Sequence, residues 1–279
     1  MQETVSIIMP VLNAQNFIVR AVGSVLNQTY QNFELLLISD DLFDYKSFLE
    51  SKKITDKRIQ FLSTGKVKSG ISHTRNFGLK ATKNNIIAVL DSDDTFMPEK
   101  LETMIPKALK YGVVTCALNY KGHDDSLITI VGDNFKKPTL QVEEYPFVNF
   151  AGNSMILIDR KRIPLNWNES YTVMEDFIFV MSCYDYVDEI AHIPQALHNY
   201  YFNPQSISNE NKASNLFVNV KREIIKNIDS KKISIKNKTA QSSMKKFLQM
   251  SLDSEIKFSK LKELNKDAKF IVFLKEIYS

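Results

Sequence analysis

The alternation of short apolar runs with segments of helical periodicity constrains the fold of this chain most strongly. Strand patterns over residues 5–11, 33–39, 59–63 and 86–90 alternate with helix patterns over 15–28, 44–51, 71–82 and about 98–111. Nearly continuous apolar runs of this length are typical of strands that are buried on both faces of a parallel sheet. The first 110 residues therefore predict an α/β sheet with right-handed crossovers.

The rest of the chain is less regular. Strand patterns cover residues 112–118, 126–131 and 153–158, a helix pattern covers 175–187, and the chain from Asn209 is lysine-rich and helical, with 227–243 as a linker between helices. Residues 211–279 hold 16 Lys and Arg against 7 Asp and Glu, whereas residues 1–210 hold 20 basic and 25 acidic residues. We expect a domain over 1–208 and a basic helical C-terminal extension over 209–279.

Composition narrows the class of protein. The 279 residues contain only two cysteines, Cys116 and Cys183, which gives neither a disulfide framework nor a zinc motif. The N-terminal residues lack the pattern of a signal peptide, and no apolar run approaches the roughly 20 residues that cross a bilayer. We expect a cytoplasmic protein, with peripheral contact at the inner face of the cell membrane still open.

Polar side chains follow three of the predicted strands at the point where each strand ends. Ligands of open α/β sheets bind beyond the carboxyl ends of the strands, so these residues are expected to share one cleft. They are Pro10 and Asn13 after the first strand, Asp40 and Asp41 after the second, and Asp91, Asp93 and Asp94 after the fourth.

Asp91, Ser92 and Asp93 form a D-x-D motif. Mg²⁺ and Mn²⁺ prefer carboxylate oxygens, and clustered carboxylates repel one another unless a cation lies among them. The alternative is a helix N-terminus, which Asp94 or Thr95 would cap. The position of the motif at the end of a buried strand favours a metal site.

Five segments in order resemble the motifs of family 2 glycosyltransferases with the GT-A fold, a Rossmann-like mixed sheet flanked by helices. The resemblance spans residues 4–208, and the chain after about 210 lies outside it. The segments are "VSIIMPVLNAQNFIVRAVGSVLNQTYQNFELLLISDD", "GISHTRNFGL", "VLDSDDTFMPEKLE", "MEDFIFV" and "YYFNPQSIS".

The resemblance implies a nucleotide-sugar donor, most often UDP-linked, bound by a nucleotide-binding half over about 1–111. Asp93 would coordinate Mn²⁺ or Mg²⁺ at the diphosphate, with Asp91 near the ribose and Asp94 nearby. Arg75 would approach the nucleotide, although a solvated helix arginine is its alternative. The other donor contacts are Pro10, Val11, Asn13, Asp40 and Ser92.

An acceptor-binding half over about 112–208 would carry the second acidic pair, Glu175 and Asp176. In an inverting transfer a carboxylate removes the proton of the acceptor hydroxyl. By resemblance Asp176 is this base and Glu175 orients it. The alternative is a helix start, where acidic residues are common.

Acceptor contacts are less defined. Asn153 and Ser154 can hydrogen-bond to sugar hydroxyls, and Trp167 could stack on a sugar face. Packing in the core is an equal alternative for Trp167.

The chain departs from the family pattern in two regions that bear on the donor's contacts. Leu42 and Phe43 replace the usual Gly-Ser after the acidic pair of the second strand, and Tyr201 and Asn203 replace the usual Arg and His of the tail. His198 could substitute in the tail, or it packs in the core. Smaller departures are Leu12, Gln15, His73 and Thr74.

The basic C-terminal helices have two competing interpretations. Met244, Phe247, Leu248 and Ser251 form one helical face that would pack on the catalytic domain or on a second copy in a homo-oligomer. The helices could instead rest on an anionic membrane near a lipid-linked acceptor. No recognised motif supports nucleic-acid binding.

We therefore expect an inverting, metal-dependent glycosyltransferase that acts on a glycan or lipid-linked acceptor in bacterial surface polysaccharide or lipooligosaccharide synthesis. A nucleotidyltransferase is an alternative, but it would need a glycine- and basic-rich loop that "PVLNAQN" does not offer. A non-catalytic binding protein derived from a transferase is the other alternative, and the altered loop and tail are its support.

Overall fold

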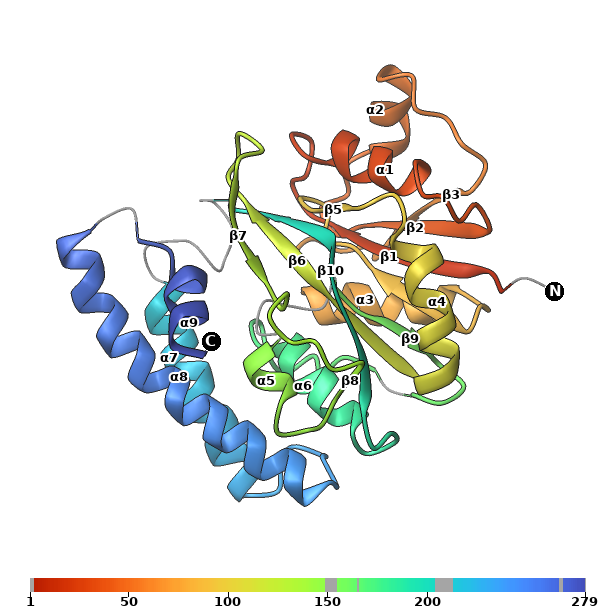
Figure 1. Ribbon diagram of the computed structural model, residues 1–279. Helices are drawn as coiled ribbons and strands as arrows, with labels where there is room; N and C mark the ends of the chain where they lie inside the picture. The colour runs from red at the N-terminus through yellow and green to blue at the C-terminus, as the bar shows by residue number, and fades with distance from the viewer. Residues whose placement is uncertain (1–2, 149–154, 165, 204–212, 266–267, 279) are drawn as a thin grey trace.

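The computed structural model describes residues 3–148, 155–164, 166–203, 213–265 and 268–278. A mixed ten-stranded sheet forms the centre of this part of the chain, in the order β3-β2-β1-β4-β9-β6-β10-β5, with β7 on β6 and β8 on β10. Helices cover both faces of the sheet (Figure 1). The expected α/β architecture with a mixed sheet is confirmed.

The first half of the fold is parallel. Strands β1, β2, β3 and β4 all run in one direction, with β1 between β2 and β4, and helices α1–α4 connect or follow them. The strands are β1 (Val5–Val11), β2 (Phe33–Ser39), β3 (Ile59–Ser63) and β4 (Ile86–Val89), and the helices are α1 (Ile18–Leu26), α2 (Tyr45–Ser51), α3 (Ile71–Ala81) and α4 (Lys100–Tyr111).

The second half adds antiparallel pairs. Strand β9 (Leu157–Asp159) lies antiparallel between β4 and β6 (Val113–Lys121), and β7 (Leu127–Val131) folds back on β6. Short strands β5 (Thr95–Phe96) and β8 (Thr139–Leu140) pair with β10 (Ile190–Tyr201). Helices α5 (Tyr145–Val148) and α6 (Glu175–Cys183) complete this half.

Strand β10 has no counterpart among the strands expected from the sequence. It runs parallel to β6 for most of its length, but the register shifts between Ile193 and Ala196 and again before His198. Pro194 lies at the first shift, and proline inside a run normally argues against a strand because it cannot donate to the ladder. The irregular pairing accommodates the proline, and beyond it His198 and Asn199 pair with Phe96 and Thr95 of β5.

Two cores lie on opposite faces of the sheet. Alternate residues of β1 enter them: Ile7 and Met9 pack with α1, α2 and α4, whereas Ile8 packs with α3, α5 and α6. Because both faces of the central strands are covered, the near-continuous apolar runs of the sequence are explained.

Helices α7 (Ala213–Asp229) and α8 (Lys238–Leu264) join the core of α5 and α6, and α9 (Phe270–Tyr278) lies beside α8 (Figure 1). The predicted inner face of α8 is confirmed, since Met244, Phe247, Leu248 and Ser251 are buried and Phe247 contacts Phe177. The predicted linker was too long: α7 ends at Asp229, and the Asn237 side chain caps α8 by accepting a hydrogen bond from Ala240 N. Within the described ranges, no helix is long and apolar enough to cross a membrane.

Candidate active site

The carboxyl ends of β1 and β2 hold two adjacent loops. Val11 lies opposite Ser39 in the parallel ladder, and the backbone N–H of Asp40 donates to Val11 O at 2.9 Å. Asn13 N donates to Asp41 Oδ2 at 2.6 Å, which ties the first loop to the second. The sequence-predicted residues Pro10, Val11, Asn13 and Asp40 therefore do lie at one edge of the sheet, and Asp91 follows β4 at the same edge.

Arg75 joins the D-x-D motif to the second acidic pair. Its guanidinium donates to Asp91 Oδ1 at 2.9 Å and to Glu175 Oε1 at 2.8 Å. The side chain is only 4% exposed, so Arg75 is not a solvated helix arginine. Three segments separated by up to 100 residues in the sequence thus meet around one buried cation.

The three aspartates after β4 have different surroundings. Asp94 is buried: its Oδ2 shares a 2.9 Å hydrogen bond with His198 Nε2, and its Oδ1 accepts from Tyr201 N at 3.0 Å. Burial lowers the pKa of His198 well below its usual value and raises the pKa of Asp94 well above its own. Asp91, Ser92 and Asp93 are half-buried. Asp94 thus holds β10 rather than facing the cleft.

This donor set fits a divalent cation only in part. No group of three His, Cys, Asp or Glu side chains in the described part of the chain is arranged to hold a metal by itself. Mg²⁺ commonly takes one or two carboxylates and completes its shell with substrate phosphates and water. Asp93 and Asp91 suit that arrangement, whereas both oxygens of Asp94 already take part in hydrogen bonds with β10.

The acidic pair Glu175–Asp176 opens helix α6. Met174, directly before it, has a left-handed backbone with φ of 63°, which turns the chain into the helix. Burial and the repulsion of Asp176 raise the pKa of Glu175 to about 7, although Arg75 opposes both effects. Burial also raises the pKa of Asp176. Raised carboxyl pKa values of this kind are typical of groups that exchange protons near neutral pH.

The Asp40 carboxylate holds the loop before α3. Its Oδ1 accepts hydrogen bonds from Thr64 Oγ1 at 2.8 Å and from Ser69 Oγ at 2.5 Å, and its Oδ2 accepts from Gly70 N at 3.2 Å. Sequence reasoning missed Thr64 and Ser69, because neither forms a pattern with Asp40 along the chain. A nucleobase contact of Asp40 would use the remaining acceptor capacity of Oδ2.

The expected acceptor residues are placed only in part. Asn153 and Ser154 lie outside the described residues. Trp167 is 2% exposed, and its ring stacks on Phe179 with centroids 4.3 Å apart. The core-packing alternative therefore describes the ring of Trp167 better than a sugar platform does.

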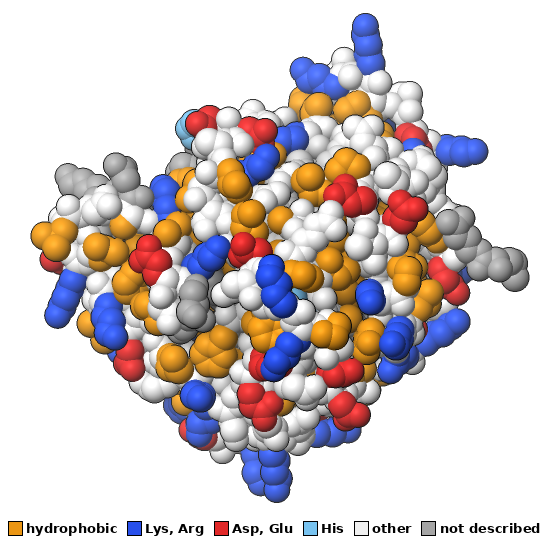
Figure 2. All heavy atoms as spheres, in the orientation of Figure 1, with side chains coloured by type: hydrophobic (Ala, Val, Ile, Leu, Met, Phe, Trp, Pro, Cys, Tyr) orange, Lys and Arg blue, Asp and Glu red, His pale blue; other side chains and the backbone are white. Residues whose placement is uncertain are grey.

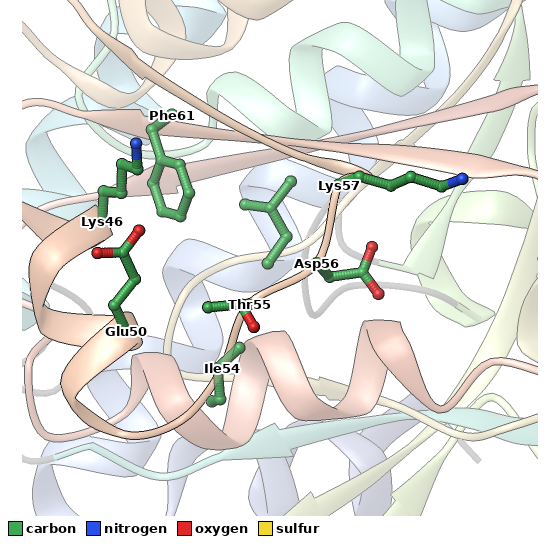
Figure 3. Close-up of a pocket in the computed structure, with 8 residues that line it drawn as sticks. Lys46, Glu50, Ile54, Thr55, Asp56, Lys57 and Phe61 are labelled. Atoms are coloured by element: carbon green, nitrogen blue, oxygen red, sulfur yellow. The ribbon is translucent and has the colours of Figure 1, made fainter.

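A pocket of about 550 Å³ lies between α2 and the segment leading into β3, where Lys46, Glu50 and Phe61 line it (Figure 3). A second pocket of about 260 Å³ is lined by Leu42 and Phe43, and it shares Lys46 and Phe61 with the first. Neither pocket is lined by a residue expected to bind the donor or to catalyse transfer.

The sequence model of glycosyl transferase family 2 matches residues 6–163, more than half of the chain. The chain is 41% identical over 117 residues to the Escherichia coli UDP-Glc:alpha-D-GlcNAc-diphosphoundecaprenol beta-1,3-glucosyltransferase WfgD, a match over 42% of this chain and 46% of that enzyme. It is 32% identical over 184 residues to an uncharacterized glycosyltransferase of Haemophilus influenzae, over 64% of this chain and 71% of that protein. The chain thus spans less than half the length of the E. coli relative.

Solved structures of S. aureus TarS share the fold. The TarS complex with UDP-GlcNAc superposes with a TM-score of 0.67 at 14% identity, over 96% of this chain and 76% of that one. The complex with UDP gives a TM-score of 0.65 at 16% identity, over 95% and 75%. These likenesses confirm the expected GT-A fold.

Proposed function

Because this chain belongs to glycosyl transferase family 2, we propose that it is an inverting, metal-dependent glycosyltransferase with a nucleotide-sugar donor, UDP-linked in the first instance. The observation that carries the proposal is the buried guanidinium of Arg75, which contacts Asp91 on one side and Glu175 on the other. Donor binding and proton removal require these two acidic groups to lie at neighbouring positions of one site.

The donor would bind at the carboxyl edge of the parallel strands. The backbone at Pro10 and Val11, with Asn13, Asp40 and Ser92, would contact the base and ribose. Asp93 and Asp91 would hold Mn²⁺ or Mg²⁺. When bound, the ion neutralises charge that develops on the leaving nucleoside diphosphate.

Asp176 is the proposed base, and Glu175 the proposed orienting residue. Glu175 is 7% exposed and paired with Arg75, whereas Asp176 is half-buried and accepts a hydrogen bond from the backbone N–H of Phe177. Asp176 takes the proton of the acceptor hydroxyl as its oxygen bonds to the anomeric carbon. The bond from that carbon to the diphosphate breaks in the same step, and inversion results.

The acceptor is proposed to be a glycan or lipid-linked sugar of bacterial surface polysaccharide or lipooligosaccharide synthesis. The name of the E. coli relative specifies a diphosphoundecaprenol-linked acceptor. The outer side of α8 exposes Ile256 and Leu264 beside Lys257 and Lys260, and Figure 2 shows apolar, basic and some acidic side chains mixed along the side formed by α7–α9. Such a surface suits an anionic leaflet.

A donor screen tests the proposal. Purified protein is assayed with UDP-, GDP-, CMP- and dTDP-sugars, with and without Mn²⁺, by thermal shift and by release of the nucleoside diphosphate. One donor should raise the unfolding midpoint and be hydrolysed or transferred, and Asp176→Asn should keep binding but lose turnover. If no nucleotide-sugar is bound or hydrolysed, the proposed function is wrong.

Membrane contact is tested separately by co-sedimentation with phosphatidylglycerol and phosphatidylcholine vesicles. Binding to the anionic vesicles that weakens in Lys257→Glu/Lys260→Glu and at high salt supports it. Equal recovery with both lipids contradicts it and leaves the enzymatic proposal unaffected.

A further inference from the structure

Arg20 of helix α1 contacts the loop that holds the D-x-D motif. Its guanidinium donates to the backbone carbonyl of Asp93 at 2.7 Å. The same guanidinium lies over the ring of Tyr201, with its central carbon 3.4 Å from the ring centroid. Tyr201 is one of the two tail positions that depart from the family pattern, so an arginine from another helix lies beside the position where arginine is usual.

Two hydrogen bonds hold Tyr201 in place beneath the Arg20 guanidinium. Its backbone N–H donates to Asp94 Oδ1, and its hydroxyl donates to Asp125 Oδ1 at 2.7 Å. Asp125 lies in the turn between β6 and β7, where Lys121 pairs with it at 2.9 Å. An arginine stacked on a ring held in this way loses little conformational entropy when it binds a ligand.

The charge of Arg20 is not used in an ion pair within the described part of the chain. Its guanidinium donates a hydrogen bond to the neutral carbonyl of Asp93, and Nε has no hydrogen-bond partner among those residues. Arg75, the other guanidinium near the motif, contacts two carboxylates. Arg58 pairs with Asp56. Arg20 therefore keeps positive charge available next to Asp93.

We propose that Arg20, stacked on Tyr201, binds the diphosphate of the nucleotide donor. The inference rests on the proposed function, because it takes the D-x-D edge as the donor site. A diphosphate that approaches Asp91 and Asp93 meets two carboxyl groups, and the guanidinium of Arg75 already pairs with Asp91 and Glu175. A second guanidinium beside Asp93 would offset this negative charge together with the proposed metal ion. Guanidinium groups bind phosphate oxygens with paired, charge-assisted hydrogen bonds.

The test compares a nucleoside diphosphate with its nucleoside, which lacks the phosphates. Calorimetric titrations use UDP and uridine, or the corresponding pair if the donor screen selects another base. Arg20→Met should weaken UDP binding by about tenfold or more, and it should leave uridine binding within about twofold. Tyr201→Phe keeps the ring but loses the hydrogen bond of the hydroxyl to Asp125, so it should weaken UDP binding less than Arg20→Met does.

A relocated arginine gives the sharpest outcome. In Arg20→Met/Tyr201→Arg the guanidinium comes from the tail, and UDP binding should recover at least in part. Arg58→Met is the matched control, because the Arg58 guanidinium also lies over a ring, that of Phe33 at 4.2 Å, but at the amino ends of β2 and β3, the opposite edge of the sheet. It should bind UDP like the wild type.

Unchanged UDP binding in Arg20→Met would overturn the inference, and so would an equal loss of UDP and uridine binding in that variant. It would also be overturned if Arg20→Met/Tyr201→Arg recovers no UDP binding although both the single and the double variant unfold at the wild-type temperature. These results differ from failure of the proposed function, in which the wild type itself binds no nucleoside diphosphate.

Discussion

The Arg75 guanidinium lies 2.8 Å from Glu175 Oε1, and both side chains are almost completely buried, at 4% and 9% exposure. Asp91 pairs with the same guanidinium from the donor side. One cation therefore compensates the buried carboxylate of Glu175 and the half-buried carboxylate of Asp91, and the protonation state of Glu175 depends on it.

Replacement of Arg75 should make stability strongly dependent on pH. In Arg75→Met the pKa of Glu175 rises further above about 7, because the positive charge that opposes burial and Asp176 is lost. A carboxyl whose folded-state pKa is raised contributes stability at low pH that is lost as pH rises through that pKa. Denaturant unfolding should show a loss of about 3–5 kcal/mol at pH 8 and a clearly smaller loss at pH 5.5.

Arg58→Met is the control for this measurement. Arg58 pairs with Asp56 at a partly exposed site and holds the pKa of Asp56 at about 2. That pair is fully ionised between pH 5.5 and 8, so its loss should cost less than about 1 kcal/mol and should not vary with pH in this range. A pH-independent loss in Arg75→Met would contradict the assigned role of the Arg75–Glu175 contact.

The pH profile of turnover should identify the base. Burial raises the pKa of Asp176, and burial together with the charge of Asp176 raises the pKa of Glu175 to about 7. If Asp176 is the base, donor-saturated kcat should fall on the acid side at a pH below 7, and Glu175→Gln should keep this limb. An acid limb at pH 7 that disappears in Glu175→Gln would assign the base to Glu175 instead.

Asp94 should contribute to stability through the tail strand rather than through the donor. Asp94→Ala leaves Tyr201 N without its acceptor and His198 without its partner, a cost of about 3 kcal/mol for buried groups. Asp94→Asn keeps an acceptor for Tyr201 and a group that can pair with His198, so it should cost about 1 kcal/mol. Denaturant midpoints with unchanged slopes measure both. If Asp94→Ala and Asp94→Asn lower the free energy of unfolding equally, the hydrogen bonds of Asp94 to Tyr201 and His198 do not stabilise the tail strand.

Sequence reasoning located the strands that carry the site because their apolar runs are nearly continuous. The parallel half follows from β1, β2 and β4 with few adjustments, and it places Asp40 and Asp91 at one edge. Local pattern could not show that Arg75 is buried, because that depends on Glu175, which is 100 residues away. Hydrophobic periodicity describes one element at a time, whereas a polar contact between elements leaves no period.

The remaining misses have the same origin. No strand was expected over residues 190–201, yet β10 forms there and continues through Pro194 with shifts of register. Arg20 was not singled out from the sequence, since nothing near it along the chain indicates Tyr201. Trp167 could be assigned either to a ligand or to the core, and only the position of Phe179 distinguishes the two.

Leu42 should carry backbone strain. Its φ is 60°, in the left-handed region that favours glycine, and its side chain is 59% exposed. Glycine normally makes the folded protein less stable than alanine does, because it raises the conformational entropy of the unfolded chain. At a left-handed position the steric strain of an alanine side chain outweighs that entropy difference. Leu42→Gly should therefore be more stable than Leu42→Ala by about 0.5–1 kcal/mol in thermal unfolding. At exposed Val67, which lacks a positive φ, the order of the two variants should reverse.

Gly78 sets the distance between helix α3 and the sheet, and hence the height at which Arg75 meets Asp91. A Cβ at Gly78 would lie 2.7 Å from Ile38 Cδ1 and 2.8 Å from Ile8 Cγ2, both buried. Gly78→Ala should therefore cost about 1–3 kcal/mol in denaturant unfolding and lower kcat, because α3 must move outward. Gly23→Ala in α1 is the matched helical control, since a Cβ there meets no atom within 4 Å, and it should gain about 0.5–1 kcal/mol. If both substitutions stabilise the protein, the close approach of α3 to β1 and β2 does not limit the position of Arg75.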